Sequence, residues 1–329
     1  MAPSRVSPPP TTSLPNGLTP KQVSSFQRDG YLILPSYLPT STCTSLLSLT
    51  NQLLTSFDLK NHPMTKFTTG TESSGNSTQK EHVGDSYFLT SGDKVRFFFE
   101  EDAFSPTDGS LLKPKERAIN KIGHALHAHL PEFGAISHQG EIGQHNAAIA
   151  KDLGYRDPRL LQSMVICKQP EIGGAVPAHQ DSTFLYTKKP SAVGFWIALE
   201  DCTVENGCLS FAAGSHRRAP IKERFVRKED DSGTTFMPIA NAEEQWPRDF
   251  ATEQGEEQKE EEYTLGEVKA GTLVLIHGNV LHKSEKNLSQ KGRMIYTFHL
   301  IEGEEEYDAQ NWLQVPGGPA EFTKLNGES

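Results

Sequence analysis

The chain has 329 residues, enough to bury a sizeable core in one large domain or two, and its 35% hydrophobic content is low but globular. A net charge of −10 argues against a general binder of nucleic acid or of anionic membranes. The four cysteines are too few and too scattered for a disulfide framework, and no apolar run approaches the roughly 18 residues of a membrane span. Because the sequence also shows neither a secretory signal nor a C-terminal peroxisomal signal, we expect a cytoplasmic protein.

The N-terminal segment 1–17 is rich in Pro, Ser and Thr and is predicted to be a disordered tail, with residues 18–329 forming a single domain. Thr19 is a good N-cap and Pro20 suits the first position of a helix. That helix is predicted to stop at Gly30 and to lead into a short strand at 31–34.

The remaining segments change in character along the chain, from helices to strands. Further predicted helices span 39–54, 118–130 and 143–153, and residues 66–82 are predicted to be a loop. Strands are predicted at 95–99, 163–168, 193–200, 207–212, 272–276 and 293–301. The charged stretch at about 221–262 is predicted to be a partly disordered insertion.

A helical N-terminal third followed by many short strands predicts an α+β protein built on an antiparallel sandwich or jelly roll, with the N-terminal helices packed against it. In such a fold, strands that are distant in sequence meet at one mouth. Residues separated by about a hundred positions can therefore share one site.

Two histidines and an aspartate have the pattern of a metal site. His179 and Asp181 are two residues apart, and His282 follows about a hundred residues later. Two imidazoles and one carboxylate form the facial triad of non-haem Fe(II) oxygenases, which leaves positions open for a cosubstrate and O2. His277 is a rival to His282 as the third ligand, because it ends the predicted strand at 272–276.

An arginine follows the second half of this pattern. Arg293 lies 11 residues after His282, the length of a strand, a turn and a return, so it is expected beside the metal. Its planar fork can bind a carboxylate of a dicarboxylate cosubstrate through two hydrogen bonds. In the strand 193–200, alternation places Phe195 with the core residues and Trp196 on the opposite face, where it could line an inner cavity.

Several motifs, in this order, resemble the phytanoyl-CoA dioxygenase family, and most closely its domain-containing subgroup. They are Phe26-Gln27-Arg28-Asp29-Gly30-Tyr31, His179-Gln180-Asp181, Gly194-Phe195-Trp196-Ile197-Ala198-Leu199-Glu200-Asp201, Glu205-Asn206-Gly207-Cys208-Leu209, Ala213-Gly214-Ser215-His216 and the segment from Gly271 through His277 and His282 to Arg293. The resemblance covers roughly residues 18–315, but not the stretch 221–262.

The resemblance implies a double-stranded β-helix, a cupin-like jelly roll, that binds Fe(II) and 2-oxoglutarate. His179, Asp181 and His282 match the iron ligands, and this match is what favours His282 over His277. Arg293 matches the residue that holds the distal carboxylate of 2-oxoglutarate, with Ser284 as its hydroxyl helper. Further positions that match cosubstrate contacts are Met164, Gln180, Trp196 and Lys121.

The reaction implied is oxidative decarboxylation of 2-oxoglutarate to succinate and CO2, coupled through O2 to hydroxylation of a small molecule, with ascorbate added in vitro. The substrate would be an acyl-CoA or a secondary metabolite. Two other classes of function fit the metal pattern: a non-catalytic metal-binding jelly roll, and a zinc hydrolase. The zinc hydrolase is disfavoured because the sequence has no H-E-x-x-H motif and Arg293 would have no role in it. No nucleic-acid, membrane or protein partner is indicated. Four basic residues flank the predicted site loops and would meet an anionic substrate if they are not simply solvated: Lys188, Lys189, Arg217 and Arg218.

Overall fold

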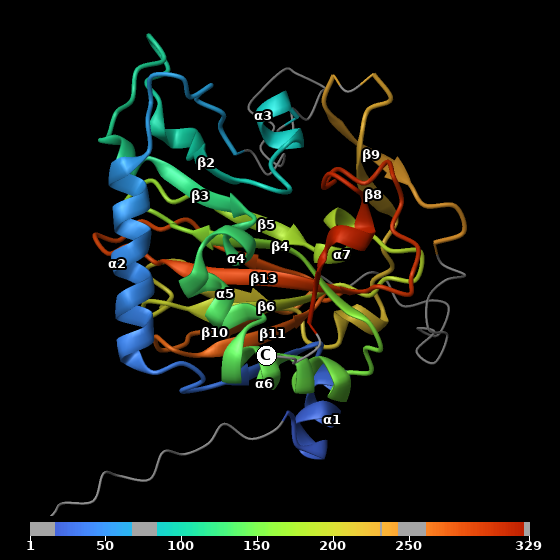
Figure 1. The fold of residues 1–329 in the computed structure, drawn as a ribbon. Helices are drawn as coiled ribbons and strands as arrows, with labels where there is room; N and C mark the ends of the chain where they lie inside the picture. The colour runs from blue at the N-terminus through green and yellow to red at the C-terminus, as the bar shows by residue number, and fades with distance from the viewer. Residues whose placement is uncertain (1–16, 68–83, 231, 243–260, 326–329) are drawn as a thin grey trace, which may run out of the picture.

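The computed structural model describes residues 17–67, 84–230, 232–242 and 261–325. Nearly all of the predicted tail 1–17, most of the predicted loop 66–82 and residues 243–260 of the predicted insertion lie outside the described residues. Two antiparallel sheets pack face to face and form the predicted jelly-roll core, with helices on the outer side of the larger sheet (Figure 1).

The larger sheet has the strand order β1-β11-β6-β13-β4-β3-β2, and β14 also pairs with β4. Its strands are β1 (Tyr31–Leu34), β2 (Val95–Phe99), β3 (Ile119–His124), β4 (Pro158–Ile166), β6 (Val193–Ala198), β11 (Leu273–His277), β13 (Ile295–Glu302) and β14 (Thr323–Lys324). Most of these residues are buried on both faces of the sheet, which explains why the strands are rich in Ile, Val, Leu and Phe.

The smaller sheet has the order β10-β7-β12-β5. Its strands are β5 (Val176–His179), β7 (Leu209–Phe211), β10 (Thr264–Gly266) and β12 (His282–Ser284). Leu209 and Phe211 from this sheet pack with Trp196, Val274 and Ile295 from the larger one, so the inner faces of the two sheets share one apolar core.

Helices cover the outer face of the larger sheet. They are α2 (Thr40–Ser56), α4 (Leu126–His129), α5 (Pro131–Ser137) and α6 (Gly140–Asp152). In Figure 1, α4, α5 and α6 lie in front of the sheet. Leu46, Phe133 and Ile149 from these helices pack in one apolar core with Phe195 and Phe298 of the sheet. The rings of Phe195 and Phe298 stack with their centroids 4.7 Å apart. Phe195 therefore faces the core under the helices, as the alternation in the strand 193–200 predicts.

The first helix, α1 (Pro20–Asp29), begins and ends where the sequence predicts. The side chain of Thr19 accepts from the backbone N–H of Gln22, and the Gln22 side chain accepts from the N–H of Thr19. Gly30 closes the helix with φ of 81°, a left-handed conformation that glycine adopts without steric cost.

The prediction of a helix over 118–130 is wrong for its first half. Residues 119–124 are strand β3, which pairs with β2 on one side and with β4 on the other, and only Leu126–His129 are helical. The apolar spacing of this segment fits a helix, but hydrogen bonds to two neighbouring strands override local preference. Lys121 therefore lies in the sheet and not on a helix.

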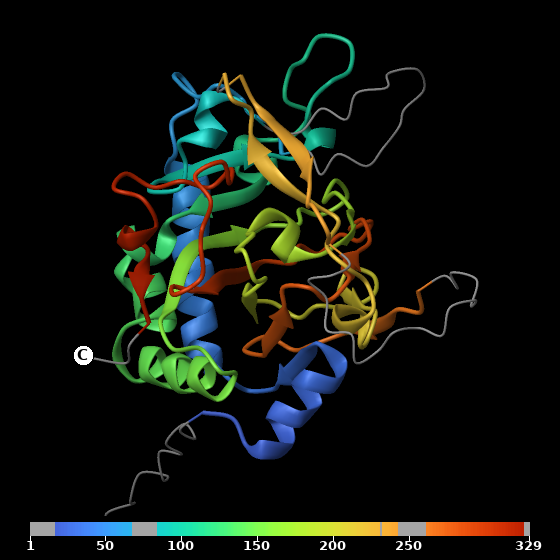
Figure 2. The same cartoon turned by 90° about the vertical axis from the view of Figure 1, so that its right-hand side faces the viewer.

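The charged stretch 221–262 contains an antiparallel hairpin of β8 (Glu223–Arg227) and β9 (Thr234–Pro238). Arg227 binds the hairpin to the rest of the protein, because its side chain donates to the backbone oxygens of Leu89 and of Trp312. Figures 1 and 2 show the hairpin close to the short helix α3 (Ser86–Leu89) and to the C-terminal segment. Among the described residues, no helix has the length and apolar character needed to cross a membrane.

The aromatic pair between the large sheet and its helices should contribute strongly to stability. Phe195 has no exposed surface, so Phe195→Ala should lower the free energy of unfolding by about 3–5 kcal/mol, through lost burial and the cavity left behind. Leu288, which is 75% exposed, is the matched control, and Leu288→Ala should change the free energy of unfolding by no more than about 0.5 kcal/mol. Urea unfolding followed by circular dichroism measures both; equal effects of the two changes would contradict this account of the core.

Candidate metal centre and cosubstrate site

Three side chains that could hold a metal converge at one end of the smaller sheet. His179 is the last residue of β5, Asp181 begins the short helix α7 (Asp181–Phe184), and His282 begins β12. The antiparallel pairing of β12 with β5 places His282 directly opposite His179. One ligand atom from each of the three residues lies within 4.8 Å of the others, close enough for all of them to bind one ion.

The hydrogen bonds of the two imidazoles direct both rings toward this point. The Nδ1 atom of His179 lies 2.9 Å from the backbone oxygen of Pro177, and that of His282 lies 3.1 Å from the backbone oxygen of Val280. A carbonyl oxygen only accepts hydrogen bonds, so Nδ1 carries the proton in both rings and the Nε2 lone pair is left for a metal. The Nε2 atoms lie 3.5 Å and 3.8 Å from Oδ1 of Asp181.

The protonation states also suit a metal. Burial lowers the pKa of His282 to about 4, so this ring is neutral at pH 7, as a ligand must be. Burial by itself would raise the pKa of Asp181, but the neighbouring His282 and His299 hold it well below its usual value, which keeps the carboxylate ionised.

His299 contacts the triad through the carboxylate of Asp181. It lies on β13, and its Nε2 is 3.3 Å from Oδ2 of Asp181, the carboxylate oxygen that does not face the other two histidines. Its Nδ1 lies 3.3 Å from the side-chain nitrogen of Gln162. No motif in the sequence indicates a role for His299. The only signal was its alternation with Ile295 and Thr297, which places it on the inner face.

His277 lies elsewhere. It ends β11, and its ring packs against Phe26 at 6.0 Å and His216 at 4.9 Å, while its Nδ1 accepts from the backbone of Asn279. The group of possible ligands contains His282 and not His277, as the resemblance implied.

Three of the residues expected to contact a cosubstrate, Met164, Trp196 and Lys121, share the inner face of the larger sheet. Met164 and Trp196 both lie opposite Thr297, on the two sides of β13. Lys121 lies opposite Ile166, in the neighbouring row of the same face, and is 8% exposed. Its Nζ sits 3.1 Å from the ring centroid of Phe67, and burial lowers its pKa to about 7.

Arg293 and Ser284 are both 2% exposed. Nη1 of Arg293 donates to the backbone oxygen of Gly207 at 2.6 Å, and its guanidinium lies 5.6 Å from the ring centroid of Trp196. Nε of Arg293 is buried and has no hydrogen-bond partner among the described residues. A buried guanidinium N–H without an acceptor is costly, and an incoming carboxylate would satisfy it.

Two further buried ionisable residues, Lys168 and Glu100, were not predicted from the sequence to be part of the site. Lys168 donates from Nζ to Oγ of Ser284 at 2.8 Å, and Glu100 accepts from Asn120 and from the backbone of Gly174. Neither residue belongs to a ligand pattern or to an alternation that would single it out.

Gln180 differs from the other expected cosubstrate contacts. Its side-chain nitrogen donates to the backbone oxygens of Ala219 and Asn279, each at 2.8 Å. The amide therefore connects the loop between His179 and Asp181 to two neighbouring loops.

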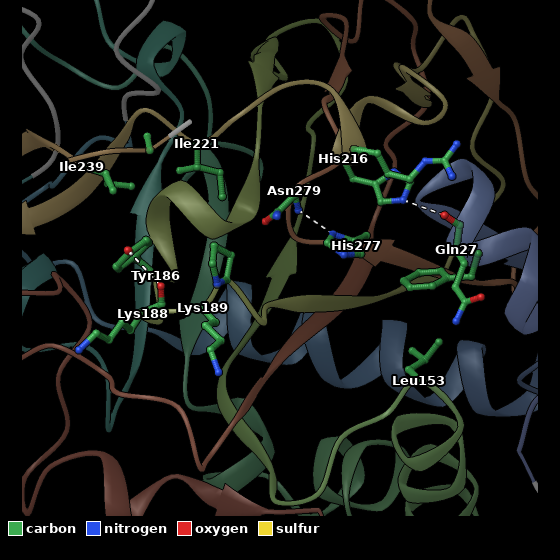
Figure 3. A pocket seen from close by; sticks show the side chains of 14 residues that line it. Gln27, Leu153, Tyr186, Lys188, Lys189, His216, Ile221, Ile239, His277 and Asn279 are labelled. Carbon is green, nitrogen blue, oxygen red and sulfur yellow. Dashed lines mark hydrogen bonds between the residues drawn. The ribbon is translucent and has the colours of Figure 1, made fainter. Parts of the chain in front are cut away.

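A cavity of about 680 Å³ is lined by His277 and Asn279, among others, and by no member of the triad. Figure 3 shows His277 and Asn279 between Tyr186, Lys188 and Lys189 on one side and Gln27 with His216 on the other. The basic side chains near these loops are largely neutralised. Lys188 pairs with Glu306 at 3.1 Å, Lys189 with Glu305 at 3.5 Å, and Arg218 with Glu261. Their arrangement fits a solvated surface better than a site for an anionic substrate.

Comparison with known proteins identifies the family to which the chain belongs. The family model for phytanoyl-CoA dioxygenase (PhyH) matches residues 26–295. Phytanoyl-CoA dioxygenase domain-containing protein 1 of Rattus norvegicus is 41% identical over 302 residues, which cover 90% of this chain and 95% of the relative. Phytanoyl-CoA dioxygenase of Arabidopsis thaliana is 38% identical over 298 residues, with 90% and 94% covered.

Among solved structures, the 2-oxoglutarate-dependent carbocyclase SnoK from nogalamycin biosynthesis has a TM-score of 0.55 at 18% identity, covering 89% of this chain and 87% of its own. EctD from S. alaskensis, solved with 2-oxoglutarate and 5-hydroxyectoine, has a TM-score of 0.53 at 16% identity, covering 90% and 80%. At such low identity these two structures establish the fold, the jelly roll expected from the sequence.

The third ligand can be tested directly. His282→Ala should weaken binding of Mn(II) by more than about a hundredfold, beyond the range typical for residues that only support a ligand. His277→Ala, the matched control at the end of the preceding strand, should leave the affinity within about twofold of the original, since no metal-binding contact is changed. Isothermal titration calorimetry measures both; a larger loss in His277→Ala would mean that the wrong histidine is assigned.

His299 should tune the metal rather than bind it. His299→Leu removes the partner of Asp181 while keeping an apolar side chain in the buried site, and should lower Mn(II) affinity by about 10- to 100-fold without abolishing it. The exposed His129 provides the control, since His129→Leu should have no effect on affinity. An unchanged affinity in His299→Leu would show that its contact with Asp181 does not support the site.

Proposed function

This chain belongs to the phytanoyl-CoA dioxygenase family of non-haem iron, 2-oxoglutarate-dependent oxygenases, and we propose that it hydroxylates a small-molecule substrate. The observation that carries the proposal is the combination of the His179, Asp181 and His282 triad with the buried guanidinium of Arg293. A metal-binding protein without the reaction would have no use for Arg293 in this position.

The triad would hold Fe(II). Its two imidazole nitrogens and one carboxylate oxygen are the donor set of the facial triad, and the Nδ1–H bonds fix both rings with Nε2 toward the shared point. Asp181 is ionised and His282 neutral, the states in which they bind a cation.

The inner face of the larger sheet would hold 2-oxoglutarate. Arg293 offers an unsatisfied N–H to the distal carboxylate, the hydroxyl of Ser284 offers a further polar group, and Met164 and Trp196 provide the apolar wall. Lys121 adds a basic side chain on the same face. Because all of these groups are buried, their electrostatic interactions with the cosubstrate are stronger than they would be in water.

Bound Fe(II) and 2-oxoglutarate supply the oxidising chemistry, in which O2 is consumed and 2-oxoglutarate becomes succinate and CO2. The contribution of the protein is geometry and exclusion of water. His299 holds Asp181 by one carboxylate oxygen, which leaves the other directed at the two histidines.

The substrate would approach the triad past His179. The side chain of His179 is 24% exposed, compared with 13% for Asp181 and 6% for His282, so the triad faces solvent mainly on this side. Here the rings of Phe184, Phe225 and Phe236 form a continuous aromatic group that begins 6.1 Å from the ring of His179. We therefore expect a substrate with an apolar body.

The test of this function is release of succinate from 2-oxoglutarate by the purified protein with Fe(II) and ascorbate, without added substrate. Asp181→Ala should abolish this release because the metal loses its only anionic ligand. Asp201→Ala, which removes a half-exposed carboxylate paired with Lys269 on the surface, should not affect it.

Near-normal succinate release by Asp181→Ala would contradict the assignment of the site. Absence of both turnover and 2-oxoglutarate binding in the unaltered protein would favour a non-catalytic metal-binding jelly roll. Binding without turnover would mean that substrate is needed to start the reaction.

A further inference from the structure

Lys168 adopts a backbone conformation that a lysine does not favour. It follows β4 by two residues, and its φ of 27° lies in the positive range that favours glycine. Residues other than glycine persist in such conformations only where the surrounding structure holds them, and they gather at functional sites. Here the backbone oxygen of Lys168 accepts from Arg293 N at 3.3 Å and from Nδ2 of Asn287 at 3.1 Å.

The ammonium of Lys168 fixes the direction of the Ser284 hydroxyl. Nζ donates to Oγ of Ser284 at 2.8 Å and to the backbone oxygen of Gly174 at 3.0 Å. An ammonium has no lone pair and cannot accept in return. The hydrogen of Ser284 must therefore point elsewhere, which leaves it available to donate to an incoming anion.

The aliphatic part of Lys168 supports the carbonyl that holds the guanidinium. A Cβ atom on Gly207 would lie 2.5 Å from Cε of Lys168, so the lysine stem packs directly against this glycine. The oxygen of Gly207 accepts from Nη1 of Arg293 at 2.6 Å. One lysine thus contacts both Ser284 and the residue that positions Arg293.

The charges around this point are not balanced within the protein. Lys121, Lys168 and Arg293 are buried within electrostatic reach of a single buried carboxylate, that of Glu100, among the described residues. The exposed Glu285 also lies within electrostatic reach of Lys168, and basic side chains still outnumber acidic ones at this point. Burial, together with the nearby Arg293, lowers the pKa of Lys168 to about 7, and a bound dianion would offset this effect.

We propose that Lys168 determines the specificity of the cosubstrate site: by its charge, and by directing the Ser284 hydroxyl, it makes the site select 2-oxo acids that carry a second carboxylate. This inference rests on the proposed function, because it concerns the same cosubstrate. It adds a second cation to the role expected of Arg293, and it explains why a lysine occupies a backbone position that would suit glycine.

Two probes of equal chain length test the proposal: 2-oxoglutarate, and 2-oxopentanoate, which has a methyl group in place of the distal carboxylate. Their affinities for the Mn(II)-loaded protein, which does not turn over, can be measured by isothermal titration calorimetry. Lys168→Met keeps an unbranched side chain that is one atom shorter and removes the charge. It should weaken binding of 2-oxoglutarate by about 10- to 100-fold, the effect of losing one charge-assisted hydrogen bond, and change binding of 2-oxopentanoate by no more than about twofold.

Lys269→Met is the matched control, because Lys269 is 84% exposed and paired with Asp201 on the surface, and it should leave both affinities unchanged. If Lys168→Met does not fold, Lys168→Gln, which is also neutral, is measured with the same expectation.

Each remaining outcome overturns a specific statement. Equal weakening of both probes in Lys168→Met would show that the lysine only maintains the structure, and unchanged affinities would show that Arg293 selects the dicarboxylate without it. If the unaltered protein does not prefer 2-oxoglutarate to 2-oxopentanoate, the proposed function itself fails.

Discussion

The pairing of β12 with β5 is the contact on which the rest of the site depends. It sets His282 opposite His179, and the chain then turns directly from His179 into α7, where Asp181 completes the triad. A shift of one residue in this register would turn the side chain of His282 to the other face of the sheet. The pairing is held in turn by β7 on the other side of β12, with Phe211 also opposite His282.

The second constraint is electrostatic. The space between the sheets contains Lys121, Lys168 and Arg293, all nearly inaccessible to solvent, and burying such charges is unfavourable unless they are paired. The lowered pKa values of the two lysines show this cost. The large apolar core between the main sheet and helices α2, α5 and α6 provides the stability that allows it. The site is thus arranged for an anion that the folded chain does not itself supply.

Some residues of the site could be predicted from the sequence and others could not, for physical reasons. His179 and Asp181 are close in the chain and carry a recognisable donor pattern, so they could be found without a fold. The spacing of the distal histidines could not separate His282 from His277, because both end or begin strands, and the choice came from the family resemblance. Lys121 was expected on a helix and lies in β3, since pairing with two strands overrides local preference. Alternation along the strand placed His299 on the inner face but indicated no role for it, and Lys168 had no local signal. Both act through contacts with residues more than a hundred positions away.

Four features could be predicted from the sequence without a structure: the class of fold, the capped first helix, the alternation of Phe195 and Trp196, and the chemical identity of the metal donors. These follow from local hydrophobic periodicity, capping residues and side-chain chemistry, which are all properties of short segments. Only the tertiary structure shows which side chains from different strands converge on the metal and cosubstrate site. It also decided that Lys168 directs Ser284, that His299 holds Asp181, and that the charged stretch after Ile221 folds into a hairpin beside α3. These depend on strand register and on packing between distant segments, which no short stretch of sequence encodes.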